Sequence, residues 1–180
     1  MARLAKLHLH VSAQVHRNLR DQLPQVLHHS FQRNPVLIPY DTDANHEPCL
    51  RNGKKAHWAI VTGFCALTSK QKLDFLPKQV SGDSSEILPV IDLELFRNEI
   101  KGKHLFTDIF KDSPLENFFL ICKQGKSCLY KLFDAEMMCQ SNNNLYEIED
   151  KRRHELEYML PEGGLHAQLN DRFLVIRNNL

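Results

Sequence analysis

The segment over residues 36–64 constrains the fold of this chain more than any other. Two apolar runs rich in β-branched residues, 36–40 and 58–64, flank a loop dense in Asp, Asn, Pro and Gly. Apolar runs bounded by turn-forming residues are typical of strands. A connection of this length is uncommon inside a compact domain and is usually functional. The sequence therefore predicts two strands joined by a functional loop.

His57 lies where this loop re-enters the second predicted strand. A strand start gives an imidazole a fixed backbone and an open face, which a general base requires. The ordinary pKa of a histidine, about 6.5, suits proton exchange near neutral pH. The alternative is a structural histidine that hydrogen-bonds a loop carbonyl.

Length and composition indicate one ordinary soluble domain. The chain has 180 residues, of which 42% are hydrophobic and 25% charged, with a net charge of +1. This charge gives no reason to expect nucleic acid or an anionic membrane as a partner, and no apolar run is long enough to span a bilayer. Five cysteines without an export signal favour reduced thiols. We therefore expect a cytoplasmic protein without a cofactor.

The remaining elements follow from periodicity and turn signals. We expect a short amphipathic helix over residues 1–9, and a helix over 22–33 with Asp21 as N-cap and Pro24 in its first turn. A hairpin is predicted from strands 118–122 and 128–133, and a closing strand from 173–176 after a turn at Gly163 and Gly164. Residues 83–111 are interpreted as an insertion on the rim of the sheet, and 147–157 as a solvated charged face.

Four stretches carry a recognisable pattern. They read Leu-Ile-Pro-Tyr-Asp-x-Asp-x-Asn-His-Glu-Pro-Cys at 37–49, Gly-x-Lys-Ala-His-Trp-Ala at 53–59, Lys-Gln-Gly-Lys-Ser at 123–127 and Pro-x-Gly-Gly at 161–164. This pattern resembles the C-terminal half of the actin maturation protease family. The resemblance implies a papain-like cysteine peptidase, related to bacteriocin-processing peptidases, that trims the acetylated N-terminus of immature actin. We accordingly expect residues 1–180 to form a single, incomplete α+β papain-like domain, mainly the antiparallel-sheet half with a short N-terminal helical segment.

The resemblance assigns His57 as the catalytic base. A third group should orient the imidazole through its other nitrogen. Gln124 is preferred because a predicted strand delivers it, although it is equally interpretable as an ordinary turn residue. Asp74 follows His57 at a distance typical of the bacteriocin-processing relatives, and Asp92 is a more distant candidate.

The resemblance also places the loop after Tyr40 beside the substrate cleft. The candidate substrate-binding residues are Asp41, Asp43, Asn45, Lys55 and Trp58. Lys54 and Lys55 are positioned to meet the acidic N-terminus of actin, the expected partner. Two structural alternatives remain: the loop carboxylates and amide make Asx-turns that set its shape, and Trp58 is a core or cleft-wall residue.

The family's nucleophilic cysteine, in a Gln-Cys-Gly context that opens a long helix upstream, has no counterpart in this sequence. Loss of a nucleophile costs on the order of 10⁶ in turnover, so we expect the chain to be nearly inert by itself. Cys49 is the alternative nucleophile, because His46 and His57 share its region. Three interpretations follow: part of a longer protease whose Met1 is an internal start, a non-catalytic actin-binding derivative, or a metal-binding module built on His46, Cys49 and His57.

Overall fold

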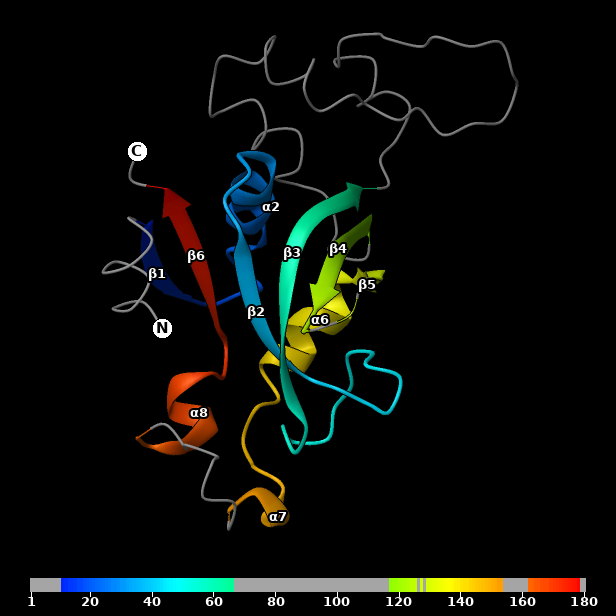
Figure 1. Cartoon of the computed structure of the whole chain (residues 1–180), viewed down its shortest axis with the longest axis vertical. Coiled ribbons are helices and arrows are strands. Elements are labelled where there is room, and N and C mark those ends of the chain that lie inside the picture. Colours follow the sequence, from blue (N-terminus) through cyan, green and yellow to red (C-terminus); the bar gives the residue numbers. More distant parts are fainter. Residues whose placement is uncertain (1–10, 67–116, 126, 128, 154–161, 179–180) are drawn as a thin grey trace, which may run out of the picture.

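A computed structural model describes residues 11–66, 117–125, 127, 129–153 and 162–178. Six strands form one antiparallel sheet with the order β1-β6-β2-β3-β4-β5 (Figure 1). The strands are β1 (Val11–Arg17), β2 (Val36–Asp41), β3 (Ala56–Ala66), β4 (Phe118–Gln124), β5 (Tyr130–Asp134) and β6 (Arg172–Asn178). The helices are α2 (Leu23–Phe31), α6 (Ala135–Asn142), α7 (Asp150–Arg153) and α8 (Gly164–Gln168). The predicted helix over 1–9, the insertion over 83–111 and the candidates Asp74 and Asp92 lie outside the described residues.

The α+β class and most of the predicted strands are confirmed. Strands β2 and β3 flank a long loop, β4 and β5 pair as a hairpin, and β6 closes the sheet between β1 and β2. The turn at Gly163 and Gly164 is also confirmed, with backbone φ angles of 78° and 75° that favour glycine. The structure extends several predicted strands by one or two residues, as expected for boundaries read from sequence.

Helix α2 confirms the predicted helix but corrects its start. Pro24 lies in the first turn as expected, whereas Gln22, not Asp21, occupies the N-cap position and makes no side-chain capping bond. The helix is held instead by burial of one face, formed by Leu23, Val26 and Leu27. Tertiary packing therefore replaces the cap that the sequence suggested.

Four of the described elements were not predicted, namely strand β1 and helices α6, α7 and α8. Strand β1 pairs along its whole length with β6, far away in sequence. Helix α6 begins directly after β5, where the Asp134 carboxylate accepts a hydrogen bond of 2.7 Å from the backbone N–H of Met137. The charged stretch expected to be only a solvated face contains the short helix α7.

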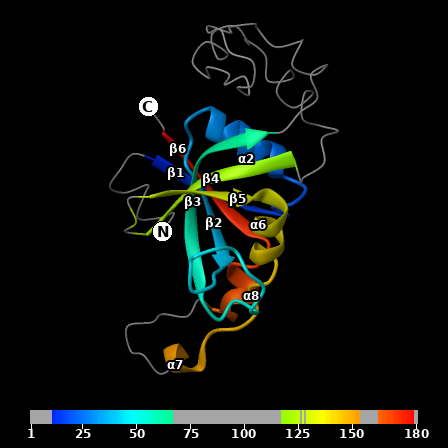
Figure 2. The same ribbon diagram turned by 90° about the vertical axis from the view of Figure 1, so that its right-hand side faces the viewer.

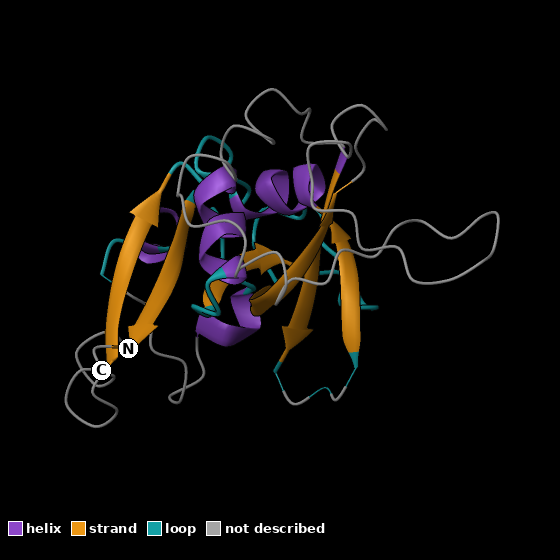
Figure 3. Cartoon of the chain, turned by 90° about the horizontal axis from the view of Figure 1, so that it is seen from above, coloured by secondary structure: helices purple, strands orange, loops and turns teal. Residues whose placement is uncertain are grey.

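The sheet has two distinct faces. Side chains alternate along each strand, and one set packs against helices α2 and α6. We call this the inner face, and in Figure 3 helices lie between the two ends of the curved sheet. Its buried core includes Val26, Leu27, Val36, Ile38, Tyr40, Ala59, Val61, Leu120, Phe133, Met138, Phe173 and Val175. The intervening side chains of the strands point to the opposite side, which we call the outer face.

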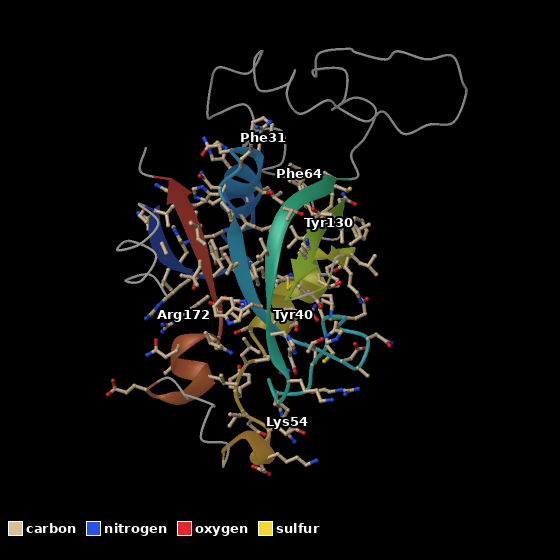
Figure 4. The ribbon with its side chains drawn as sticks, in the orientation of Figure 1. Phe31, Tyr40, Lys54, Phe64, Tyr130 and Arg172 are labelled. Carbon is tan, nitrogen blue, oxygen red and sulfur yellow. The ribbon has the colours of Figure 1, made fainter. Side chains whose placement is uncertain are left out.

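The two ends of the molecule also differ. Helix α2 lies at one end, and α7 with the loop between β2 and β3 lies at the other (Figures 1 and 2). Phe31 and Phe64 mark the α2 end, whereas Lys54 marks the loop end (Figure 4). The residues singled out in the sequence around His57 therefore gather at the loop end of the sheet.

Candidate active site around His57

His57 is the second residue of β3 and lies directly opposite Tyr40 of β2. Its alternation with Ala59 and Val61 places it on the inner face, where it is half-buried. The loop over residues 42–55 joins the end of β2 to the start of β3, one residue pair beyond Tyr40 and His57. The position matches the sequence prediction of a histidine with a fixed backbone beside a long loop.

Two side chains from different strands converge on the backbone carbonyl of His46 in this loop. The Tyr40 hydroxyl donates a hydrogen bond of 3.1 Å, and the Gln124 amide donates one of 2.7 Å. The Gln124 amide also donates to the Tyr40 hydroxyl. Burial raises the pKa of Tyr40 to about 12, so its hydroxyl remains protonated and able to donate at neutral pH. This triangle fixes the loop against the end of the sheet.

The imidazole of His46 then meets that of His57. Their ring centroids are 5.4 Å apart and the ring planes are inclined by 75°. His46 adopts a left-handed backbone conformation with φ of 62°, which costs energy for a residue other than glycine and persists where its surroundings enforce it. The carbonyl bonds from Tyr40 and Gln124 provide that enforcement. In the sequence, His46 is a candidate metal ligand and a neighbour of Cys49, and its contact with His57 was not predicted.

Gln124 reaches this site as the last residue of β4, where it pairs with Ala59 of β3. It is buried, and its described amide bonds go to Tyr40 and His46. The structure therefore brings the predicted pair of Gln124 and His57 to the same end of the sheet. His46 links them, because Gln124 bonds its carbonyl and its ring contacts His57. Asp74, the competing candidate, lies outside the described residues.

The tip of the loop has the Asx-turn predicted as an alternative. The Asp43 carboxylate accepts hydrogen bonds from the backbone N–H groups of Asn45 (2.8 Å) and Glu47 (2.9 Å). These bonds hold the pKa of Asp43 below its usual range, and the bond from Glu47 has the largest effect. Lys131 of β5 forms an ion pair of 2.7 Å with Glu47 and also donates to the carbonyl of Asn45. The tip is thus tied to the edge of the sheet.

The base of the loop is closed by Asp41. Its carboxylate is fully buried and accepts hydrogen bonds from the backbone N–H groups of Arg51 and Gly53. Its own backbone N–H and carbonyl bond the hydroxyl of Ser141 in α6, at 2.9 and 2.8 Å. This carboxylate faces the interior of the loop, where it shapes the backbone.

The other predicted substrate-binding residues are accessible. Asn45, Lys54 and Lys55 are exposed on the loop. Trp58 is 37% exposed and, by alternation with His57, points to the outer face. His46 is also exposed, so the face of the site that carries its ring is open to solvent.

The described cysteines lack the properties of a reactive thiolate beside His57. Burial raises the pKa of Cys122 and of Cys139 to about 12. Burial and the nearby charge of Asp41 also raise the pKa of Cys49, whereas a nucleophile requires a lowered one. Cys65 is exposed but lies eight residues farther along β3, roughly 26 Å away at about 3.3 Å per residue. Cys128 lies outside the described residues.

Within the described ranges, His, Cys, Asp and Glu side chains form no group of three or more that could hold a metal ion. The metal-binding module proposed on His46, Cys49 and His57 therefore has no support in this part of the chain. Among the same residues, no helix is long and apolar enough to cross a membrane.

Comparison with known proteins identifies the family. The family described as actin maturation protease-like, C-terminal domain, matches residues 1–65, which include His46 and His57. The chain is 37% identical to the actin maturation protease of Danio rerio over 155 residues, 86% of this chain and 47% of that protein. It is 36% identical to that of Mus musculus over 154 residues (85% and 40%) and 32% identical to that of Homo sapiens over 152 residues (84% and 40%).

The chain therefore spans less than half the length of these relatives. No solved structure matches it. The family match over the loop and β3, together with the aligned relatives, shows that this chain belongs to the actin maturation protease family, within its C-terminal part.

Proposed function

We propose that this chain is the histidine-bearing part of a papain-like cysteine peptidase that hydrolyses the peptide bond near the acetylated N-terminus of immature actin. The observation that carries the proposal is the contact between His57 and His46, whose carbonyl is held by Gln124 and Tyr40. A base must be held in one orientation to accept a proton productively. Here the buried side chains of Tyr40 and Gln124 fix His46, and the imidazole of His57 lies against the ring of His46.

In this proposal His57 accepts the proton of a cysteine thiol, and the resulting thiolate attacks the scissile carbonyl. His57 then returns the proton to the leaving amine, which leaves the acyl group on the cysteine as a thioester. A water molecule that gives its proton to His57 attacks this thioester, and the carboxylic acid product and the free thiol are released. Gln124 acts as a positioning residue through the His46 carbonyl, and Asp74 remains a candidate for a direct partner of the imidazole. The thiol comes from outside the described residues, because the described cysteines have raised pKa values or lie distant from His57.

The substrate side of the proposal uses the exposed part of the loop. Lys54 and Lys55 attract the acidic N-terminus of actin, and the backbone around Asp43 and Asn45 borders the peptide. Such exposed charges contribute more to the rate and direction of approach than to affinity. The expected compartment is the cytoplasm, with actin as the partner and no role for nucleic acid.

A chimera tests the catalytic assignment. The aligned C-terminal part of the Mus musculus protein is replaced by this chain, and processing of an acetylated actin N-terminal peptide is followed by mass spectrometry. We expect cleavage by the chimera and a loss of at least about 10³-fold in the His57→Ala variant, as for removal of a catalytic base. A folded chimera that cleaves equally well with and without His57 would exclude the role of this residue.

A second candidate is an actin-binding protein that does not cleave. It is favoured by the raised pKa values of the Cys49, Cys122 and Cys139 thiols, which make these thiols poor nucleophiles. Titration of the acetylated peptide into this chain by calorimetry separates the two. Binding that leaves the peptide intact, combined with a folded but inactive chimera, would select this second function.

A further inference from the structure

A cluster of basic side chains lies where helix α2 meets the β1 edge of the sheet. His16 comes from β1, Arg177 from β6, and His28 and His29 from the last turn of α2. His16 pairs with the buried Phe173, and alternation along β6 places Arg177 on the same inner face. Strand β1 forms this edge beside β6 (Figure 1), so three elements far apart in the sequence contribute to the cluster.

His29 lies at the centre of the cluster. Its Nε2 atom is 3.4 Å from an Nη atom of Arg177. Its ring centroid is 6.3 Å from that of His16 and 6.1 Å from that of His28. His29 is 7% exposed, whereas His16 and Arg177 are half-buried. The cluster therefore lies at the border between the core and the solvent.

Two buried N–H groups of this cluster have no acceptor. A guanidinium only donates, so its contact with His29 makes Nε2 the acceptor and puts the proton of the neutral imidazole on Nδ1. This Nδ1–H is buried without a hydrogen-bond partner, and so is the Nε–H of Arg177. Nε2 of His16 is a third buried nitrogen without a partner. Buried polar groups are nearly always paired, and exceptions in native proteins are explained by a bound water, a bound ion or a functional role.

The three elements supply no carboxylate as an acceptor. Strand β1, helix α2 and strand β6 contain neither Asp nor Glu. Among the described residues, the charged groups that face His29 are Arg177 on β6, His16 on β1 and His28 on its own helix. Burial, followed by these basic neighbours, lowers the pKa of His29 to about 4. Positive charge combined with unpaired donors is the chemistry that recognises an anion.

We propose that His16, His29 and Arg177 bind a small oxyanion of the phosphate or sulfate class between α2 and the β1–β6 edge. A tetrahedral oxyanion accepts hydrogen bonds at several oxygens, so its donors need not point at one atom. The guanidinium supplies charge and its Nε–H, the imidazole of His29 supplies its Nδ1–H, and His16 adds a third donor as its Nε2–H tautomer.

The bound ion ties the first and the last described strands to helix α2. A ligand that binds only the folded chain stabilises it by mass action. The site is separate from that around His57, because β6 and β2 lie between β1 and β3 in the sheet. The inference therefore does not rest on the proposed function.

Calorimetric titration of this chain with inorganic phosphate and with sulfate, at an ionic strength kept constant with sodium chloride, tests the site. We expect Kd for both ions to rise at least about tenfold in Arg177→Met. Arg172→Met is the matched control, because this arginine of the same strand alternates with Phe173 and lies on the outer face. Its Kd should stay within about twofold of the wild type.

His16→Met is a second variant, which keeps an apolar contact with Phe173 and removes the nitrogen. We expect it to weaken binding as well, and circular dichroism confirms that each variant is folded. Absence of saturable binding of both ions by the wild type overturns the site. Equal Kd values in Arg177→Met, His16→Met and the control also overturn it.

The pH dependence of sulfate binding separates a ligand role of His29 from a structural one. Sulfate keeps its charge between pH 7.5 and 5.5, so a change in Kd reports protons bound by the protein. An anion favours the protonated imidazole, so we expect Kd of the wild type to fall at least about threefold over this range. The change should shrink in His29→Gln, which keeps a donor but cannot take up a proton, and persist in the exposed control His166→Gln. Equal pH dependence in wild type and His29→Gln overturns the role of His29.

Phosphoserine distinguishes the two sources of a phosphate group. Weaker binding of phosphoserine than of inorganic phosphate identifies the free ion as the ligand. Tighter binding that is lost in Arg177→Met identifies a phosphate ester. Tighter binding that is retained in Arg177→Met places the ligand elsewhere and overturns the site.

Discussion

The imidazole of His46 stands edge-on to that of His57, with 5.4 Å between the ring centroids. Its position depends on Gln124, which lies 78 residues later in the sequence and bonds the His46 carbonyl. The loop histidine and the strand histidine are therefore held together by a third strand. A substitution at Gln124 of β4 should therefore alter the surroundings of His57 even though the sequence of the loop is unchanged.

Replacing Gln124 with Met removes the amide and keeps a similar volume. The Tyr40 hydroxyl and the His46 carbonyl each lose a buried partner, so we expect the free energy of unfolding to fall by about 1–3 kcal/mol. We also expect the pKa of His57 to move, because His46 no longer has a fixed position. Denaturant unfolding and NMR titration of the His57 ring measure the two effects.

Gln140→Met is the matched control, since this exposed amide on α6 bonds only Glu136 among its described contacts. It should leave both the unfolding free energy and the His57 titration close to wild type. A Gln124→Met protein that behaves like this control would show that the triangle around His46 does not position the site.

Asp41 and Asp43 each accept two backbone N–H groups, but only Asp41 is enclosed. Asp41→Ala leaves the backbone N–H groups of Arg51 and Gly53 without their carboxylate acceptor inside the protein, so we expect the free energy of unfolding to fall by about 3 kcal/mol or more. Asp43→Ala should cost clearly less, because water replaces its carboxylate. Thermal unfolding of both variants tests this order. Equal losses of stability in the two variants would mean that the buried Asp41 carboxylate does not hold the loop more strongly than the exposed Asp43 carboxylate.

His29 predicts a loss of stability in mild acid. Burial, with Arg177, His28 and His16 nearby, lowers its pKa to about 4, whereas an unfolded histidine has a pKa of about 6.5. Between pH 6.5 and 4, His29 therefore binds a proton in the unfolded chain but stays neutral in the folded chain. The contribution of the neutral His29 to the free energy of unfolding is complete above pH 6.5 and is lost as the pH falls toward 4. Urea unfolding at pH 7.5 and 5 measures the difference.

The variant His29→Gln should show a smaller fall in unfolding free energy between those two pH values. His166→Gln is the control, because this ring is exposed and its contact among the described residues is stacking on Tyr146, with 5.1 Å between the ring centroids. It should retain the full wild-type fall. The same fall in all three proteins would place the acid sensitivity elsewhere.

Cysteine alkylation should follow exposure and pKa. At pH 8 we expect iodoacetamide to modify Cys65 first, Cys49 more slowly, and Cys122 and Cys139 only after unfolding. Peptide mapping by mass spectrometry follows each site over time. Fast modification of Cys49 at pH 6, abolished by His57→Ala, would instead reveal a thiolate–imidazole pair and restore Cys49 as a nucleophile.

The sequence predicted the sheet where apolar runs were bounded by strong turn signals, as at β2, β3 and the β4–β5 hairpin. Strand β1 was missed although Val11, Ala13 and Val15 alternate with polar residues as in a half-buried strand. Its partner among the described strands, β6, lies near the other end of the sequence, so no local turn signal marks the pairing. Helix α6 did carry a signal, since Asp134 has the residue type and position of an N-cap.

The site was predicted in part for a similar reason. His57 and Gln124 stood out because predicted strands place them at element ends. The contribution of His46 depends on a left-handed backbone and on bonds from Tyr40 and Gln124, and neither can be read from residue spacing. Asp41 was a candidate substrate-binding residue. Its burial against the backbone of the loop depends on how the loop folds back, and the sequence does not show this.

The position of β6 between β1 and β2 has a consequence for synthesis of the protein. Val11 pairs with Asn178, so β1 has no sheet partner among the described strands until the last of them has left the ribosome. At roughly 5–20 residues per second, the earliest strand waits on the order of ten seconds as an unpaired segment. During that interval β2 also presents the edge that β6 will occupy. Nascent chains should therefore be most vulnerable to chaperone capture or mispairing until β6 has emerged.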